Sequence, residues 1–217
     1  MNPWYFLLLG ILVIALAVAV PRIRLRRALK APFPDEWVAL LEQNIGVYSR
    51  LPMALRMQLR QRIKRFLHTK HFSGAGGLEI DDEIRVTIAA QACMLLLNRR
   101  IAVYPRLRTV LVYPSTYVAG KEDGSPSVRL GESWNVGVVV LAWDSVSHGA
   151  ANFNDGRNVT LHEFAHQLDQ EDGAGDGAPI LADRSAYRTW ATVFTREYKA
   201  LRKRVNKGRR TVMDRYG

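Results

Sequence analysis

Residues 158–169 read NVTLHEFAHQLD, and the pattern within them decides how the rest of the chain is interpreted. His162 and His166 are four residues apart, so on a helix they lie one turn apart on the same face. Two imidazoles in that arrangement can converge on one metal ion, with Glu163 beside them. Zinc lowers the pKa of a bound water towards ~7, where a nearby carboxylate can take its proton. The spacing therefore predicts a zinc site formed by His162 and His166, with Glu163 as the general base rather than a ligand.

The residues around the two histidines are typical of a helix that packs into a core. The apolar positions are Val159, Leu161, Phe164, Ala165 and Leu168. Asn158 or Asp155 can cap the first turn. The alternative is a helix whose histidines are solvated or hydrogen-bonded. The apolar helix and the β-rich segment before it favour the metal site over that alternative.

A catalytic zinc normally takes three protein ligands and leaves the fourth position to water. Asp172 lies six residues after His166, where the metzincin pattern places its third ligand, but that pattern requires Gly at the position of Asp169. Glu197 lies on the apolar stripe of a downstream helix and is either a ligand or the partner of an arginine. The residues alone leave the third ligand open between these carboxylates.

The N-terminus has the features of a membrane anchor. Residues 3–20 read PWYFLLLGILVIALAVAV, and no charged residue precedes Arg22. At 1.5 Å per residue, this stretch approaches the ~30 Å hydrocarbon thickness of a bilayer. A cleaved signal peptide carries its positive charge before the apolar stretch, whereas here five basic residues follow it, between Arg22 and Lys30. We therefore expect an uncleaved single-pass helix with its N-terminus outside and the following domain in the cytoplasm.

Hydrophobic periodicity predicts the main elements beyond the anchor. Helices are expected over residues 34–46, 51–69, 81–97 and 184–205, and strands over 109–113 and 136–143. The polar segment 120–131 between the two strands is expected to form either a hairpin-like excursion or a surface loop. Three parts follow: a transmembrane anchor (1–21), a basic juxtamembrane linker (22–34) and one globular domain (35–217).

Composition limits the remaining classes of function. Hydrophobic residues make up 48% of the 217 residues, which excludes wholesale disorder, and the single cysteine, Cys93, excludes an internal disulfide. The formal net charge of +11 arises largely from two clusters, Arg22–Lys30 and Arg202–Arg210. Membrane topology explains the first cluster, and a solvated helix end explains the second. Nucleic acid is therefore not an expected partner.

Three segments resemble the Mlc titration factor family of bacterial zinc metallopeptidases. They are HFSGAGGLEIDDEIRVTIAAQACMLLL (71–97), VGVVVLAW (136–143) and FNDGRNVTLHEFAHQLDQEDG (153–173). The resemblance implies an α+β, zincin-like metallopeptidase domain, related to the catalytic domain of anthrax lethal factor and preceded here by one transmembrane helix. It implies aminopeptidase-like hydrolysis of peptides, Zn²⁺ as the cofactor, and, in enterobacteria, binding to the Mlc repressor.

The resemblance also assigns roles to residues. It makes His162 and His166 zinc ligands and Glu163 the base, and places a third ligand, a Glu, in an NPxEFFA-like segment just after a tyrosine similar to Tyr216. The sequence ends at Gly217 before such a segment, so we expect the chain to be a C-terminally truncated form. The expected function is a zinc peptidase at the bacterial inner membrane with a cytoplasmic catalytic domain. The alternative is a non-catalytic membrane-tethered protein that binds a transcriptional regulator.

Overall fold

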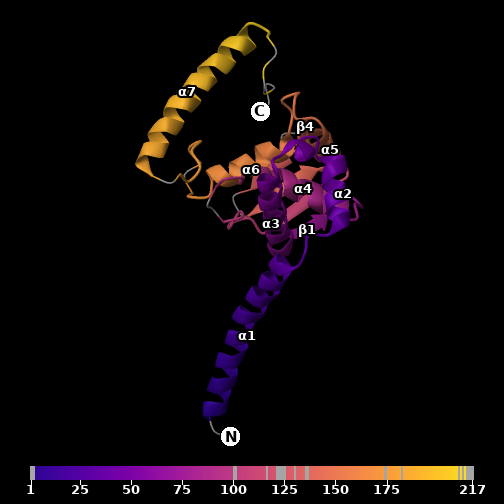
Figure 1. Ribbon diagram of the computed structural model, residues 1–217, viewed down its shortest axis with the longest axis vertical. Coiled ribbons are helices and arrows are strands. Elements are labelled where there is room, and N and C mark those ends of the chain that lie inside the picture. The colour runs from indigo at the N-terminus through magenta and orange to yellow at the C-terminus, as the bar shows by residue number, and fades with distance from the viewer. Residues whose placement is uncertain are drawn as a thin grey trace.

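The computed structural model describes residues 3–99, 102–115, 117–120, 126–129, 131–134, 137–173, 175–181, 183–209, 211 and 213. Helices and a small sheet form the body of the molecule, from which two helices project at opposite ends (Figure 1). The helices are α1 (Pro3–Lys30), α2 (Asp35–Asn44), α3 (Met53–Thr69), α4 (Asp82–Met94), α5 (Trp143–Ala151), α6 (Val159–Asp169) and α7 (Arg184–Asn206), with a 3-10 turn at Tyr48–Arg50. The fold is thus mixed α and β, as the sequence predicted.

Four strands form the main sheet, in the order β1-β2-β6-β5. They are β1 (His71–Gly74), β2 (Thr109–Tyr113), β6 (Val138–Ala142) and β5 (Gly131–Trp134). The first three run parallel, which requires crossover connections, and α4 lies in the connection between β1 and β2. Strand β5 pairs antiparallel with β6 and forms one edge of the sheet.

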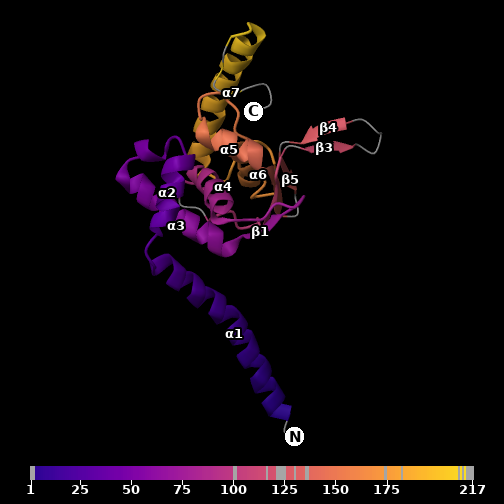
Figure 2. The same ribbon diagram turned by 90° about the vertical axis from the view of Figure 1, so that its right-hand side faces the viewer.

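A separate antiparallel pair, β3 (Tyr117–Gly120) and β4 (Pro126–Arg129), projects from the body (Figure 2). This pairing confirms the hairpin-like alternative for the polar segment between the strands. The predicted helices over residues 34–46, 51–69, 81–97 and 184–205 and the predicted strand over 109–113 are also confirmed. Helix α5 and strand β5 were not predicted.

The core lies between α3, α4, α6 and the sheet. Phe66 of α3, Tyr104 and Phe164 of α6 meet there, with ring centroids 5.7 Å apart for Phe66 and Phe164 and 4.9 Å apart for Tyr104 and Phe164. All three rings are buried. Cys93 of α4 is also completely buried, as expected for a small hydrophobic residue, and burial raises the pKa of its thiol well above the ordinary value. This core fixes the inner face of α6.

Helix α1 extends away from the body as one continuous helix (Figures 1 and 2). The segment Trp4–Lys30 is long and apolar enough to cross a membrane by length and composition, and the apolar part of it is not buried by the rest of the chain. The helix continues through the basic stretch after Pro21 up to Lys30. The first part of the linker expected from the sequence is therefore helical.

Helix α7 carries the predicted apolar stripe, but no residue of α7 is buried. The Asp183 carboxylate caps it by accepting hydrogen bonds from the backbone amides of Ser185 and Ala186. Phe194, on the stripe, is 55% exposed and stacks on Trp190 of the same helix. The helix stands apart from the body (Figure 1), so its stripe does not contribute to the core.

Candidate functional site

The HEFAH segment lies on α6, as its spacing predicted. The Asn158 side chain caps the helix by accepting a hydrogen bond from the backbone amide of Leu161 at 2.8 Å. Phe164 and Leu168 face the core, whereas His166 is exposed and His162 is partly exposed. The helix thus presents its histidines outward from a buried inner face.

The two imidazoles approach each other closely. The Nε2 atoms of His162 and His166 are 3.1 Å apart, and their rings are nearly perpendicular, with centroids 4.6 Å apart. Two nitrogens bound to one tetrahedral zinc at 2.0–2.1 Å would lie roughly 3.3 Å apart. The imidazole pair therefore fits two ligand positions of a zinc ion, and it also fits a hydrogen bond between neutral rings.

Glu163 has the environment of a candidate base. Its side chain is only 3% exposed, and its carboxyl forms no hydrogen bond or ion pair within the part of the chain that the structure describes. Burial alone raises its pKa from 4.5 to about 7. A carboxyl group with such a pKa can both accept and release a proton near neutral pH.

Two neighbouring helices, α4 and α5, hold the start of α6 in place. The Asn158 Nδ2 atom donates to the side-chain oxygen of Gln91 on α4 at 2.9 Å and to the carbonyl of Gly149 on α5 at 2.8 Å. Gln91 is completely buried, and its own Nε2 donates to the carbonyl of Val146. A Cβ at Gly149 would lie 3.0 Å from the Asn158 side chain, so glycine permits this close approach. Asn158 therefore joins α4, α5 and α6.

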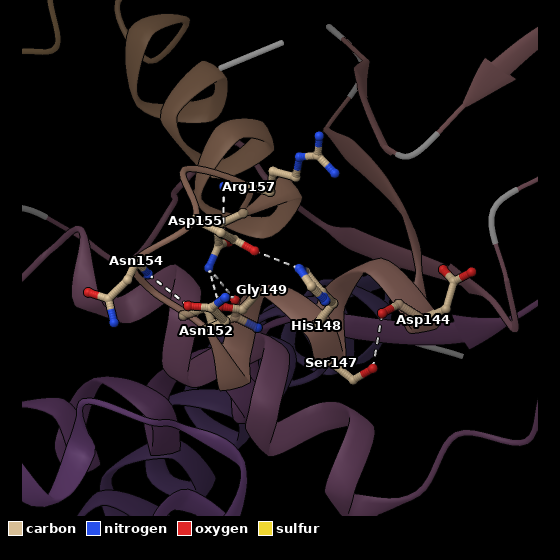
Figure 3. A network of polar contacts seen from close by, with 10 residues as sticks. Asp144, Ser147, His148, Gly149, Asn152, Asn154, Asp155 and Arg157 are labelled. Carbon is tan, nitrogen blue, oxygen red and sulfur yellow. Dashed lines mark hydrogen bonds and ion pairs between the residues drawn. The ribbon is translucent and has the colours of Figure 1, made fainter. Parts of the chain in front are cut away.

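A surface network supports the turn that leads into α6 (Figure 3). His148 Nε2 lies 2.7 Å from Asp155 Oδ2, and Asp155 Oδ1 accepts from the backbone amide of Arg157 at 2.9 Å. The amide of Arg157, and then the hydrogen bond with His148, hold the pKa of the Asp155 carboxyl below its usual value. Asp155 thus stabilises the turn, while Asn158 forms the helix cap that the sequence assigned to either residue.

The carboxylates considered as a third ligand do not join the histidines. Within the described residues, no group of three or more His, Cys, Asp or Glu side chains could hold a metal ion, so neither Asp172 nor Glu197 completes such a group. Glu197 is 64% exposed on α7 and pairs with Arg196 at 2.9 Å, which is the second of the two roles expected for it. Tyr216 lies outside the described residues.

Sequence reasoning missed the supports of α6. Gln91 lies in the apolar segment 88–97, where a lone glutamine gives no sign of its partner 67 residues away. His148 and Asp155 are likewise separated by a helix end that the sequence did not reveal. A polar residue on the inward face of a predicted helix is the one signal that could have indicated a buried hydrogen bond.

Comparisons with known proteins place the chain in a family. The sequence profile of the glucose-regulated metallo-peptidases M90 matches residues 20–217. An uncharacterized protein of Synechocystis sp. is 39% identical over 206 residues, which cover 89% of this chain and 74% of that protein. Mlc titration factor A of Klebsiella pneumoniae is 30% identical over 148 residues, 63% of this chain and 54% of the relative.

A third relative, Mlc titration factor A of Cronobacter sakazakii, is 29% identical over 165 residues, which cover 71% of this chain and 59% of that protein. The matches thus extend over 54% and 59% of these two titration factors. All three alignments cover more than half of the chain. The family match and the two relatives named Mlc titration factor A thus give the chain's class in different terms, the first as a metallo-peptidase and the second as a titration factor.

Proposed function

Because this chain belongs to the family of glucose-regulated M90 metallopeptidases, we propose that it is a zinc-dependent peptidase in which His162 and His166 hold the metal and Glu163 is the general base. The family match supports a metallopeptidase, and the resemblance described above implies zinc as its metal. The observation that carries the proposal is the 3.1 Å separation of the two imidazole Nε2 atoms beside a buried carboxyl. We further propose a zincin-like fold and aminopeptidase-like action.

The chain's own residues would share the chemistry as follows. Zinc, when bound, supplies a Lewis acid that polarises the peptide carbonyl and acidifies water. Glu163 accepts the proton of the attacking water and delivers it to the leaving amine. Burial raises the pKa of this carboxyl to about 7 in the metal-free chain, and a bound zinc ion would lower it and favour the carboxylate that accepts the proton. The cap at Asn158 keeps the first turn of α6 fixed during both transfers.

Metal binding is tested by measuring zinc stoichiometry and affinity on the full chain in detergent. We expect one zinc per chain, and at least a hundredfold weaker binding in His162→Ala. His148→Ala is the matched control, because His148 is an exposed histidine on α5 that pairs with Asp155 instead. Binding that survives in His162→Ala, or that is lost equally in the control, would rule out this site.

Catalysis is tested with Glu163→Gln, which keeps the shape of the side chain and removes its basicity. Hydrolysis of a peptide with a free N-terminus should fall by at least a hundredfold while zinc remains bound. Glu36→Gln, an exposed glutamate at the start of α2, is the control. Hydrolysis that persists in Glu163→Gln would exclude the mechanism, and equal cleavage of N-acetylated peptides would exclude aminopeptidase action.

A second function is favoured by the names of the relatives. Two of them are called Mlc titration factor A, which points to binding of the Mlc regulator by those proteins. We propose binding of a regulator of that type as the alternative, compatible with a catalytic role. Capture of purified Mlc by both His162→Ala and Glu163→Gln would favour binding as a function separate from chemistry. Failure of the wild-type chain to capture it would remove this alternative.

We also propose the arrangement of the chain at the membrane. Residues 1–21 would span the bacterial inner membrane, residues 22–34 would lie at its cytoplasmic surface, and residues 35–217 would form the cytoplasmic peptidase domain. The basic residues that follow the apolar part of α1 support this orientation. We expect the chain to stay in the membrane fraction during alkaline extraction. We also expect protease to digest the domain only in inside-out vesicles, where the cytoplasmic side is exposed. Extraction into the supernatant would refute the anchor.

A further inference from the structure

The charges of the chain are separated in space. Helices α1 and α3 together carry ten basic side chains and no acidic one, five between Arg22 and Lys30 and five between Arg56 and Arg65. The remainder of residues 35–183 contains ten basic and 18 acidic residues. The charged residues of α1 and α3 are therefore basic throughout, whereas the remainder of residues 35–183 has a net charge of −8 (10 basic minus 18 acidic). We call residues 22–30 of α1 together with residues 56–65 of α3 the basic junction.

A buried lysine joins the two halves of the basic junction. Lys64 of α3 is 6% exposed, and its Nζ atom donates to the carbonyl of Leu29 at 2.9 Å and also to the carbonyl of Ala31. Leu29 lies in the last turn of α1 and Ala31 directly follows the helix, so Lys64 lies at the C-terminal end of α1, where a cation is favoured by the helix dipole. Burial lowers the pKa of Lys64. The contact holds the end of α1 against α3, so the basic residues of the two helices lie close to one another.

Among the described residues, no carboxylate pairs with these cations. Within the residues that the structure describes, none of the ten basic side chains forms an ion pair. The hydrogen-bond partners they have are neutral oxygens: Arg56 donates to the carbonyl of Leu51, and Arg60 to the hydroxyl of Tyr48. The five basic residues of α1 and Arg65 of α3 are exposed. A concentration of exposed cations without internal partners favours an anionic partner outside the chain.

The position of the basic junction along α1 indicates which kind of anion it binds. The 18 apolar residues 3–20 span about 27 Å as a helix, close to the ~30 Å hydrocarbon thickness. The headgroup layer on each side is about 5–8 Å thick. Arg22 to Arg27 occupy the next ~9 Å of the same helix, so they reach the depth of the phosphates. A nucleic acid would require the same cations to turn away from a membrane that α1 enters.

We propose that the basic junction binds the headgroups of anionic phospholipids and thereby sets the orientation of the domain on the membrane surface. The inference rests on the proposed membrane insertion of α1. Anionic headgroups attract the α1 and α3 cations together, because Lys64 fixes the two helices to each other. The acidic remainder of the body is repelled from the same surface. The domain is thus held with α3 facing the bilayer.

The test is native mass spectrometry of the full chain in neutral detergent, titrated with phosphatidylglycerol or with phosphatidylcholine of the same acyl chains. The wild type should retain phosphatidylglycerol at least tenfold more tightly. Each basic residue near the surface contributes about fivefold. The variant Arg24→Gln/Arg26→Gln/Arg27→Gln should lose at least tenfold of that preference. The variant Arg56→Gln/Arg65→Gln should also lower it, and this variant leaves the basic residues that set membrane topology unchanged.

The matched control is Arg184→Gln/Arg188→Gln/Arg196→Gln, which removes three basic residues from α7, and it should keep the preference of the wild type. Equal retention of both lipids, or an equal loss in the control, would overturn the proposal. So would displacement of bound phosphatidylglycerol by single-stranded RNA at equimolar nucleotide phosphate, which would indicate a site for nucleic acid. Alkaline extraction measures insertion independently, so a failed anchor is distinguishable from a failed lipid site.

Discussion

Replacing Glu163 by glutamine is expected to stabilise the metal-free protein at alkaline pH, although the same change should abolish hydrolysis. Glu163 is 3% exposed, and burial raises its pKa from 4.5 to about 7. The folded chain therefore binds this proton more tightly than the unfolded chain does. The stability that the protonated form contributes is fully present below pH 4.5 and is lost as the pH rises through about 7.

The size of the loss follows from the two pKa values. A difference between 4.5 and about 7 corresponds to roughly 3 kcal/mol of unfolding free energy at about 1.4 kcal/mol per pH unit. Glutamine has the shape and polarity of the protonated acid and never ionises. At pH 8 the variant should thus be more stable by roughly 2–3 kcal/mol, or about 5–10 °C in Tm for a domain of this size. At pH 4.5 the two proteins should unfold at similar temperatures.

The assay is thermal unfolding followed by tryptophan fluorescence, on the full chain in neutral detergent with a chelator, from pH 4.5 to 8. The control is Glu36→Gln, which removes an exposed carboxylate and should follow the wild type at every pH. The reasoning is refuted if Glu163→Gln and the wild type show the same dependence of Tm on pH. That result would mean that the Glu163 carboxylate is solvated or paired in the folded chain.

Three further substitutions test the supports of the site and of α1, each by equilibrium or thermal unfolding against the wild type. Asn158→Ala removes the cap of α6 and leaves the side-chain oxygen of Gln91 without its donor, so it should lower the free energy of unfolding by about 2–4 kcal/mol. A decrease below ~0.5 kcal/mol would contradict the role of Asn158. Phe164→Ala should cost about 3–5 kcal/mol, because it empties a completely buried position between two aromatic rings. Lys64→Met should lower the free energy of unfolding by about 1–3 kcal/mol and increase proteolysis between residues 30 and 34. Unchanged proteolysis would mean that Lys64 does not hold the end of α1 against α3.

Local patterns were sufficient to predict most helices and the site-bearing segment. The spacing of His162 and His166 and the cap at Asn158 are properties of one helix, and periodicity reveals them without knowledge of the fold. The strand over residues 109–113 was predicted with its bounds because it is short, β-branched and buried on alternate positions. Strand β5 was missed because the segment GESW has neither an apolar run nor a clear alternation.

The way in which the helices and strands pack against one another was harder to predict from the sequence. The apolar stripe on α7 was recognised from the sequence, and the structure leaves it exposed, since an amphipathic pattern specifies a face but not its partner. Glu197 was considered as a ligand on that same pattern, and it pairs with Arg196 at the surface. The contact of Asn158 with Gln91 depends on how α4 and α6 cross, which no local pattern encodes.

The polar groups at the start of α6 differ in their hydrogen bonding from those of its first turns. Asn158 satisfies its carbonyl oxygen and its amide with three partners, so the first turn is fixed. Thr160 and Glu163 follow within five residues and are buried, and the Thr160 hydroxyl has no hydrogen-bond partner in the part of the chain that is described. Buried polar groups are normally hydrogen-bonded, and exceptions concentrate at functional sites. A helix anchored at Asn158 can hold Glu163 in an environment that opposes its ionisation, and the raised proton affinity that results is consistent with the general-base role proposed for Glu163.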